Sequence, residues 1–196
     1  MALTLVTGPA ADPVSLADVK AHLRIDGALE DATLLAYVQA ARLHLEGRDG
    51  WLNRALITQT WDYTLDRFPI TVCGASWDPT IYVPLPPLQS VTSITYTDTN
   101  GAPQVLAPTE YDIDTKADPG RIVPAYGKYW PATRAVVNAV TVRFVAGYGA
   151  GAAAIPRPIR LALLGLVGDY NEHRDTDGPT PKWIEALLAP FRSWKF

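Results

Sequence analysis

Two segments near the start of the chain carry apolar residues at intervals of three and four positions, the spacing that is typical of amphipathic helices. These positions are Leu16, Val19 and Leu23 in the first segment, and Leu34, Val38, Ala41 and Leu45 in the second. Ser15 precedes the first segment and Asp18 lies three positions later, a pairing that satisfies free N–H groups at a helix start. The pattern predicts a helical hairpin over about residues 15–48.

The period of the pattern changes to two after residue 56. Between residues 57 and 65, large residues alternate with Thr and Asp, which predicts a half-buried strand with Trp61 facing the core. Further strands are predicted at 81–83, 91–97, 110–113 and 139–146. Asn100-Gly101 and Asp118-Pro119-Gly120 are typical of tight turns between strands. Residues 56–147 are therefore expected to form a β-rich part.

Helical spacing returns towards the end of the chain. Ile159, Leu163, Leu166 and Tyr170 share one face of a helix that begins near Pro156. Trp183, Leu187 and Phe191 align on a last short helix that Pro190 should end, which leaves residues 191–196 as a tail. The order predicts an α+β fold in which the N-terminal αα-hairpin and the C-terminal helices, over about 156–190, form a helical core with a central β-rich insertion. We expect one domain over residues 1–196.

Composition narrows the classes of function. The chain has 17 basic and 20 acidic side chains and a net charge of -3, which argues against a dedicated DNA-binding module but is compatible with a wall that DNA passes. Cys73 is the single cysteine, so no internal disulfide forms and a reducing, cytoplasmic place of synthesis is expected. The first residues do not resemble a signal peptide, and the apolar run at 161–167 is too short to span a bilayer.

Candidate catalytic motifs are weak. Residues 147–152 match the Gly-x-Gly-x-x-Ala pattern of dinucleotide-binding loops, but Pro156 and Pro158 occupy the following helix start, and no parallel strand with a ribose-binding acid follows. We interpret this segment as a strand-to-helix connection. The three histidines, His22, His44 and His173, are too dispersed for a local metal motif and are expected on exposed or partly exposed helix faces. No catalytic, cofactor-binding or metal-binding residue is predicted, and the chain is not expected to be an enzyme.

The C-terminal tail is the stronger candidate for a functional site. It consists of Phe191, Arg192, Ser193, Trp194, Lys195 and Phe196. Aromatic and cationic side chains dominate the energetic hot spots of protein interfaces, so the tail is a candidate anchor for a partner's groove. The alternative is that the tail folds back on the subunit's own core. The same two interpretations apply to Trp77 and Trp130 in the β-rich part.

Several segments together resemble a known family. They are residues 14–24, 30–46, 54–61, 85–91 with 94–96, 144–149 and 156–174. In this order they resemble the phage head–tail connector, or adaptor, proteins, the family of gp6-like and phiE125 gp8-like connectors that also occurs in gene transfer agents. The resemblance covers nearly the full length, although each segment alone is a weak motif.

The resemblance implies a structural role in the neck of a phage-like particle, made in the bacterial cytoplasm. Copies of the subunit would form a twelvefold ring beneath the portal protein, extend the DNA channel without sequence-specific binding, and carry a stopper or tail-completion protein. In similar proteins the C-terminal segment docks on the portal, which here corresponds to residues 191–196. No cofactor and no membrane are implied. Two alternatives stay open: another neck protein, of a class usually dominated by β structure, and a small enzyme that uses the loop at 147–151.

Overall fold

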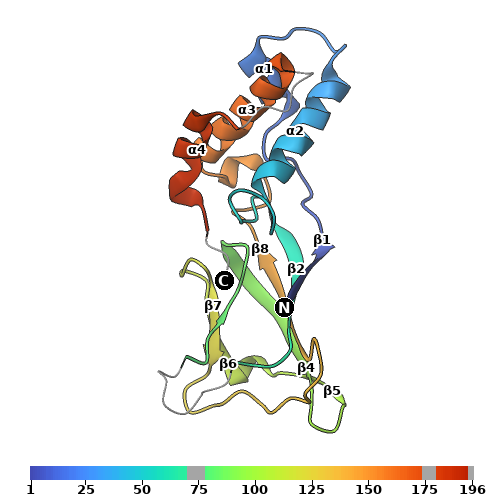
Figure 1. Cartoon of the computed structure of the whole chain (residues 1–196), viewed down its shortest axis with the longest axis vertical. Coiled ribbons are helices and arrows are strands. Elements are labelled where there is room, and N and C mark those ends of the chain that lie inside the picture. The colour runs from blue at the N-terminus through green and yellow to red at the C-terminus, as the bar shows by residue number, and fades with distance from the viewer. Residues whose placement is uncertain (70–77, 174–179, 194–196) are drawn as a thin grey trace. The chain divides into compact units, whose positions relative to one another are not determined.

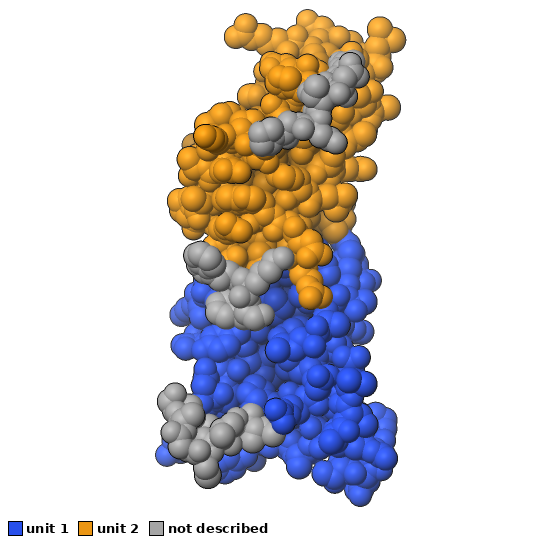
Figure 2. Space-filling view, viewed as in Figure 1, with its two compact units in different colours: residues 1–8, 59–147, 195–196 blue, residues 9–58, 148–194 orange. Residues whose placement is uncertain are grey.

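The computed structural model describes residues 1–69, 78–173 and 180–193 (Figure 1). Within these ranges it contains four α-helices and two antiparallel sheets, which confirms the predicted α+β class. The residues group into two compact units (Figure 2). The sheet unit contains residues 1–8 and 59–147, and the helical unit contains the described residues of 9–58 and 148–193. The expectation of a single domain over the whole chain stays a prediction.

The helical unit is built from both ends of the chain. Its helices are α1 (Leu16–Leu23), α2 (Asp31–Leu45), α3 (Arg157–Glu172) and α4 (Lys182–Leu188). Helix α3 packs against each of the other three. The four predicted positions of α2, Leu34, Val38, Ala41 and Leu45, are fully buried together with Ile159 and Leu163 of α3. The predicted apolar stripes of the two long helices are therefore confirmed.

The predicted start of α1 is also confirmed. The Ser15 hydroxyl accepts a hydrogen bond from the backbone N–H of Asp18 at 3.1 Å. In return the Asp18 carboxylate accepts from the Ser15 hydroxyl at 2.7 Å and from its backbone N–H at 3.4 Å. These reciprocal bonds satisfy two N–H groups that a helix start leaves free.

The predicted last helix is present as α4, and its most deeply buried residues are Ile184 and Leu188. Of the three residues that the sequence aligns on one face, Leu187 and Phe191 pack partly buried against the core. Trp183 is 52% exposed and lies across α3 at Gly165, where an added Cβ would collide with the indole ring. The helix phase is set by packing on α3, which the spacing of apolar residues within α4 does not determine.

The larger sheet of the sheet unit has the strand order β1-β2-β8-β4-β5, and all pairs are antiparallel. Its strands are β1 (Ala2–Thr7), β2 (Gln59–Leu65), β4 (Leu88–Thr97), β5 (Pro103–Val105) and β8 (Val140–Ala146). The smaller sheet has the order β3-β7-β6, with β3 (Ile81–Tyr82), β6 (Tyr111–Asp114) and β7 (Arg121–Pro124). The 3₁₀ turns are η1 (Pro108–Glu110), η2 (Ala152–Ala154) and η3 (Ala189–Phe191).

Strand β8 lies at the centre of the larger sheet and separates an apolar from a polar face. Val140, Val142, Phe144 and Ala146 are buried on one face. On the other face, the Arg143 guanidinium donates two hydrogen bonds of 2.8 Å to the Asp62 carboxylate of β2. The alternation that we read from the sequence at 139–146 therefore corresponds to the two faces of one strand.

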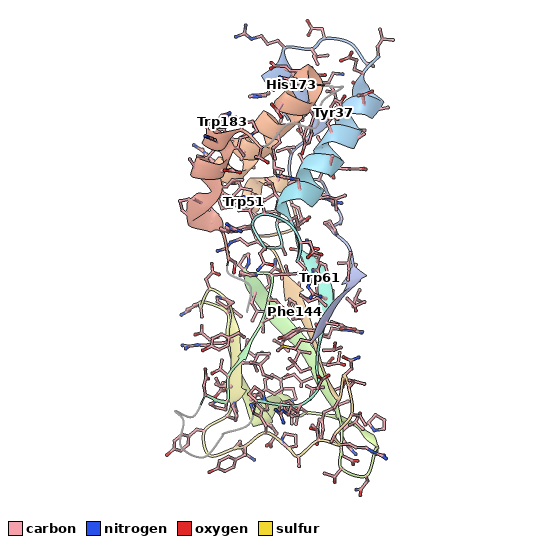
Figure 3. All side chains as sticks on the ribbon, in the orientation of Figure 1. Tyr37, Trp51, Trp61, Phe144, His173 and Trp183 are labelled. Carbon is pink, nitrogen blue, oxygen red and sulfur yellow. The ribbon has the colours of Figure 1, made fainter. Side chains whose placement is uncertain are left out.

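The prediction that Trp61 belongs to the core is wrong, because its side chain is only half-buried (Figure 3). Trp61 lies opposite the buried Phe144 on one side and opposite Leu5 of β1 on the other. Strand β1 is the edge of the sheet, and Leu5 is 47% exposed. Trp61 has the core-facing phase, but its neighbour on the β1 side is itself largely exposed, so the indole is only half-buried.

Three strands were not predicted from the sequence: β1, β5 and β7. Strand β5 begins with Pro103 and β7 ends with Pro124, and proline is depleted in strands. In β1 the alternation of Leu3, Thr4 and Leu5 is interrupted at Val6, where the register with β2 shifts. These strands form because a neighbouring strand supplies backbone hydrogen bonds. The short patterns of apolar and polar residues within them do not indicate that pairing.

We predict that Ser15→Ala lowers the free energy of unfolding by about 1 kcal/mol at neutral pH, because it removes a helix cap. Hydrogen bonds from Ser15 hold the pKa of Asp18 below its ordinary value. Because the pKa of Asp18 is lower in the folded than in the unfolded protein, its carboxylate stabilises the fold at any pH above the unfolded-state pKa. This stabilisation is lost as the pH falls through the folded-state pKa. The difference between variant and parent, measured by denaturant unfolding, should therefore shrink below about pH 4. Thr33→Ala, which removes an exposed hydroxyl within α2, should show no such pH-dependent loss.

Phe144→Ala should lower the free energy of unfolding by about 3–5 kcal/mol, because it leaves a cavity where a fully buried ring packs. The matched control is Val105→Ala in β5, whose side chain is 71% exposed and which should change stability by less than about 0.5 kcal/mol. Chemical denaturation followed by tryptophan fluorescence measures both. Equal losses in the two variants would show that β8 is not the centre of this unit.

Candidate assembly surfaces

The start of the predicted tail is held by the helical unit. The Ser193 backbone N–H donates to the Leu52 carbonyl at 2.9 Å, and Ser193 is 8% exposed. The Arg54 side chain donates to the Phe191 carbonyl, and Phe191 packs partly buried against the core of this unit. Phe191 to Ser193 therefore match the fold-back alternative, while Trp194, Lys195 and Phe196 lie outside the described residues.

Arg192 makes the remaining contact of this segment. Its guanidinium carbon lies 5.0 Å from the centre of the Trp51 ring, within the range of a cation–π interaction. Trp51 belongs to the loop that follows α2 and is half-buried against the helical core. Arg192 is thus exposed, while the residues before and after it, Phe191 and Ser193, are hydrogen-bonded to the loop that contains Trp51.

The loop that receives this segment, residues 46–58, is itself fixed by hydrogen bonds. The Glu46 carboxylate accepts from the Leu56 N–H at 2.7 Å, and the Gly47 N–H donates to the Arg54 carbonyl at 2.9 Å. Leu52, Leu56 and Ile57 are fully buried in the helical core. A loop anchored in this way presents Trp51 and Arg54 at defined positions.

A second candidate surface lies in the sheet unit, in the segment between β7 and β8. Trp130 of this segment stacks on Phe68, with ring centroids 4.9 Å apart and planes at 6°, and its indole N–H donates to the Pro79 carbonyl at 2.6 Å. The ring is half-buried, so this tryptophan is held within its own unit. Trp77 lies outside the described residues.

An open apolar hollow of about 970 Å³ adjoins these rings. Its lining includes Phe68, Pro79, Tyr129, Trp130, Val136 and Val137. Tyr129 and Val137 are 76% and 80% exposed, and the nearby Tyr126 is fully exposed. Exposed aromatic and aliphatic side chains at this density are typical of surfaces that contact another protein.

Acidic side chains of both units take part in turns and ion pairs. Asp114 accepts from the Lys116 N–H and the Arg121 side chain, both at 3.0 Å, and these bonds hold its pKa below the ordinary value. Asp98 closes the turn between β4 and β5 by accepting from the N–H groups of Asn100 and Ala102, each at 2.9 Å, and its pKa is lowered in the same way. Asp31 pairs with Lys20 at 2.6 Å.

The glycine-rich loop after β8 uses its backbone groups within the protein. The Gly147 N–H donates to the Pro87 carbonyl at 2.9 Å, and the Gly147 carbonyl accepts from the Gln89 side chain at 2.7 Å. The Gly149 carbonyl accepts from the Thr58 N–H at 2.9 Å. These bonds are those of a strand-to-helix connection.

The histidines do not gather at a site. His22, His44 and His173 are exposed, as predicted; His44 lies 2.9 Å from the Thr180 hydroxyl, and His173 lies 3.2 Å from the Asp169 carboxylate. Within the described ranges, no cluster of three or more His, Cys, Asp or Glu side chains is arranged to hold a metal ion. No helix in the same ranges has the length and apolarity needed to cross a membrane.

Comparison with known proteins adds the biological setting. No family model matches the chain, and no curated protein matches it. Solved structures do match, and they come from gene transfer agent (GTA) particles. The match to chains in these particles covers the full length of this chain. In the neck of an empty GTA particle computed with C6 symmetry, the matching chain has 25% identity and a TM-score of 0.78.

Two further structures agree. A chain in the virion of a native GTA particle has 26% identity and a TM-score of 0.77, and one in the neck of a native particle computed with C12 symmetry has 26% identity and a TM-score of 0.75. In all three, the match covers 100% of this chain and 97% of the other. The likeness supports a component of the neck of a GTA-like virion. The narrower resemblance to gp6-like connectors stays a prediction.

We predict that Trp51→Ala increases the rate of limited trypsin cleavage after Arg192 several-fold, because it removes the ring on which the guanidinium stacks. Mass spectrometry of the released C-terminal peptide measures the rate. Trp61→Ala removes a half-buried indole from the sheet unit and should leave this cleavage unchanged. A similar increase in both variants would mean that general destabilisation, and not loss of the Trp51 contact, exposes the site.

Proposed function

We propose that this chain is a head-to-tail connector, or adaptor, subunit in the neck of a phage-like or GTA particle. Copies of it form a ring, twelve in the completed neck, that joins the portal vertex to the tail and extends the DNA channel. The observation that carries the proposal is the full-length likeness to chains from GTA necks. The described helical unit favours this role over a stopper or tail-completion protein, since those proteins are usually dominated by β structure.

A connector needs surfaces and no chemistry, and the described side chains fit that requirement. Asp98 and Asp114 accept hydrogen bonds in turns, Asp18 belongs to a helix cap and Asp31 pairs with Lys20, while the three histidines are dispersed along the chain. The net charge of -3 suits a channel wall along which DNA slides without sequence-specific binding. The further partners of the ring are the portal protein on the head side and a stopper or tail-completion protein on the tail side. No cofactor and no membrane take part.

The portal contact is assigned to the C-terminal segment, residues 191–196, and its two halves have different roles in this proposal. Phe191, Arg192 and Ser193 are bound to the loop of Trp51 and Arg54, so they fix the point where the last three residues begin. Trp194, Lys195 and Phe196 supply two aromatic rings and one cation to the portal. Holding the base of an anchor on its own subunit reduces the entropy that is lost when the anchor binds.

Deletion of residues 194–196 should leave a folded subunit that no longer joins DNA-filled heads to tails, because every described contact of Phe191 to Ser193 is kept. Thermal denaturation reports folding, and electron microscopy of the particles reports joining. Deletion of 191–196 should in addition lower the stability of the helical unit, since it removes the partners of Arg54 and Leu52.

The control replaces Val105 of β5 by alanine, because this side chain is 71% exposed and lies in neither candidate assembly surface. This variant should still join heads to tails. Normal joining by the chain that ends at Ser193 would overturn the assignment of the portal contact, and absence of the parent chain from purified particles would overturn the neck function.

A further inference from the structure

Helix α2 has an apolar stripe towards the core and a mostly apolar, uncharged face on the opposite side, and the subunit covers only the first. Its two charged residues, Asp31 and Arg42, are half-buried and are paired with Lys20 and Glu46. Opposite the core-facing stripe, an uncharged outer face is exposed to solvent. This outer face consists of Ala32, Leu35, Ala36, Gln39, Ala40 and Leu43.

The exposure of this face is large for apolar side chains. Leu35 and Leu43 are 39% and 67% exposed. A helix on the surface of a soluble protein normally carries charged side chains towards water, whereas this face of α2 carries two leucines, three alanines and one glutamine. The outer face of α2 therefore has the composition of a buried surface.

A second apolar patch lies on α3 and α4 of the same unit. The Trp183 indole lies across Gly165, which has no side chain to displace it, and is 52% exposed (Figure 3). Leu161 lies one helical turn before Gly165 on the same side of α3 and is 48% exposed. Leu161 and Trp183 together form what we term the Trp183 patch, and tryptophan is the residue most enriched at the energetic centres of interfaces.

We propose that the outer face of α2 in one copy packs against the Trp183 patch of the next copy, and that this contact closes the ring. The inference rests on the proposed neck function. A ring of identical subunits needs two different surfaces on each copy, one for each neighbour, and these two patches meet that requirement. A second copy is the occupant because similar chains come from necks computed with C6 and C12 symmetry, in which each chain repeats around the axis.

Cysteine cross-linking in assembled particles tests the pairing. With Cys73→Ser as the background, the double variant Leu43→Cys/Leu161→Cys should give a ladder of covalent multimers with a short bis-maleimide. Each single variant should give none, because a head-to-tail contact never brings two copies of one residue together. Covalent dimers from either single variant, or no ladder from the double variant in particles that contain it, would overturn the contact.

Leu43→Lys separates this proposal from the neck function. A charge placed in a buried apolar contact should reduce the number of copies retained per particle at least about tenfold, whereas Val105→Lys, an equally exposed position in β5, should leave it unchanged. Both variants should keep the melting temperature of the parent. Full retention of Leu43→Lys in particles would reject the α2 contact while the neck function stands; absence of the parent chain from particles would reject both.

Discussion

The packing of α3 against α2, α1 and α4 is the contact on which the rest of the helical unit depends. It brings residues near position 40 together with residues near position 160, so both ends of the chain must be present before this core exists. The buried leucines of the 46–58 loop complete the same core, and this loop in turn holds Phe191 and Ser193. Loss of packing at α3 would therefore also release the base of the proposed portal anchor.

In the sheet unit, the pairing register of the strands determines which side chains are buried. Strand β8 pairs with β2 on one side and β4 on the other, so its buried residues define the apolar face for three strands. Coverage falls towards the edge at β1, which explains why Phe144 is fully buried while Trp61 opposite it is half-buried. The exposed segment around Tyr126 and Tyr129 adds a further surface that an assembly can cover.

A protein that works by assembly is expected to look incomplete when it is alone. Apolar side chains such as Leu43 and Trp183 lie exposed on the helical unit. Carboxylates such as Asp18, Asp98 and Asp62, in contrast, take part in a helix cap, a turn and an ion pair. An active site shows the opposite arrangement, in which polar side chains are available to act on a substrate. The arrangement in this chain agrees with the likeness to chains of GTA necks.

The sequence by itself determined the features that depend on near neighbours along the chain. The period of apolar residues located α2, α3, β2 and β8, and the Ser15–Asp18 pair located a helix start, because side-chain spacing and capping are local. The tertiary structure decided which of these residues are shared with other elements. Burial of Trp61 depends on an adjacent strand, the orientation of Trp183 on a neighbouring helix, and the docking of Phe191 to Ser193 on a loop more than a hundred residues away, and no local pattern encodes these partners.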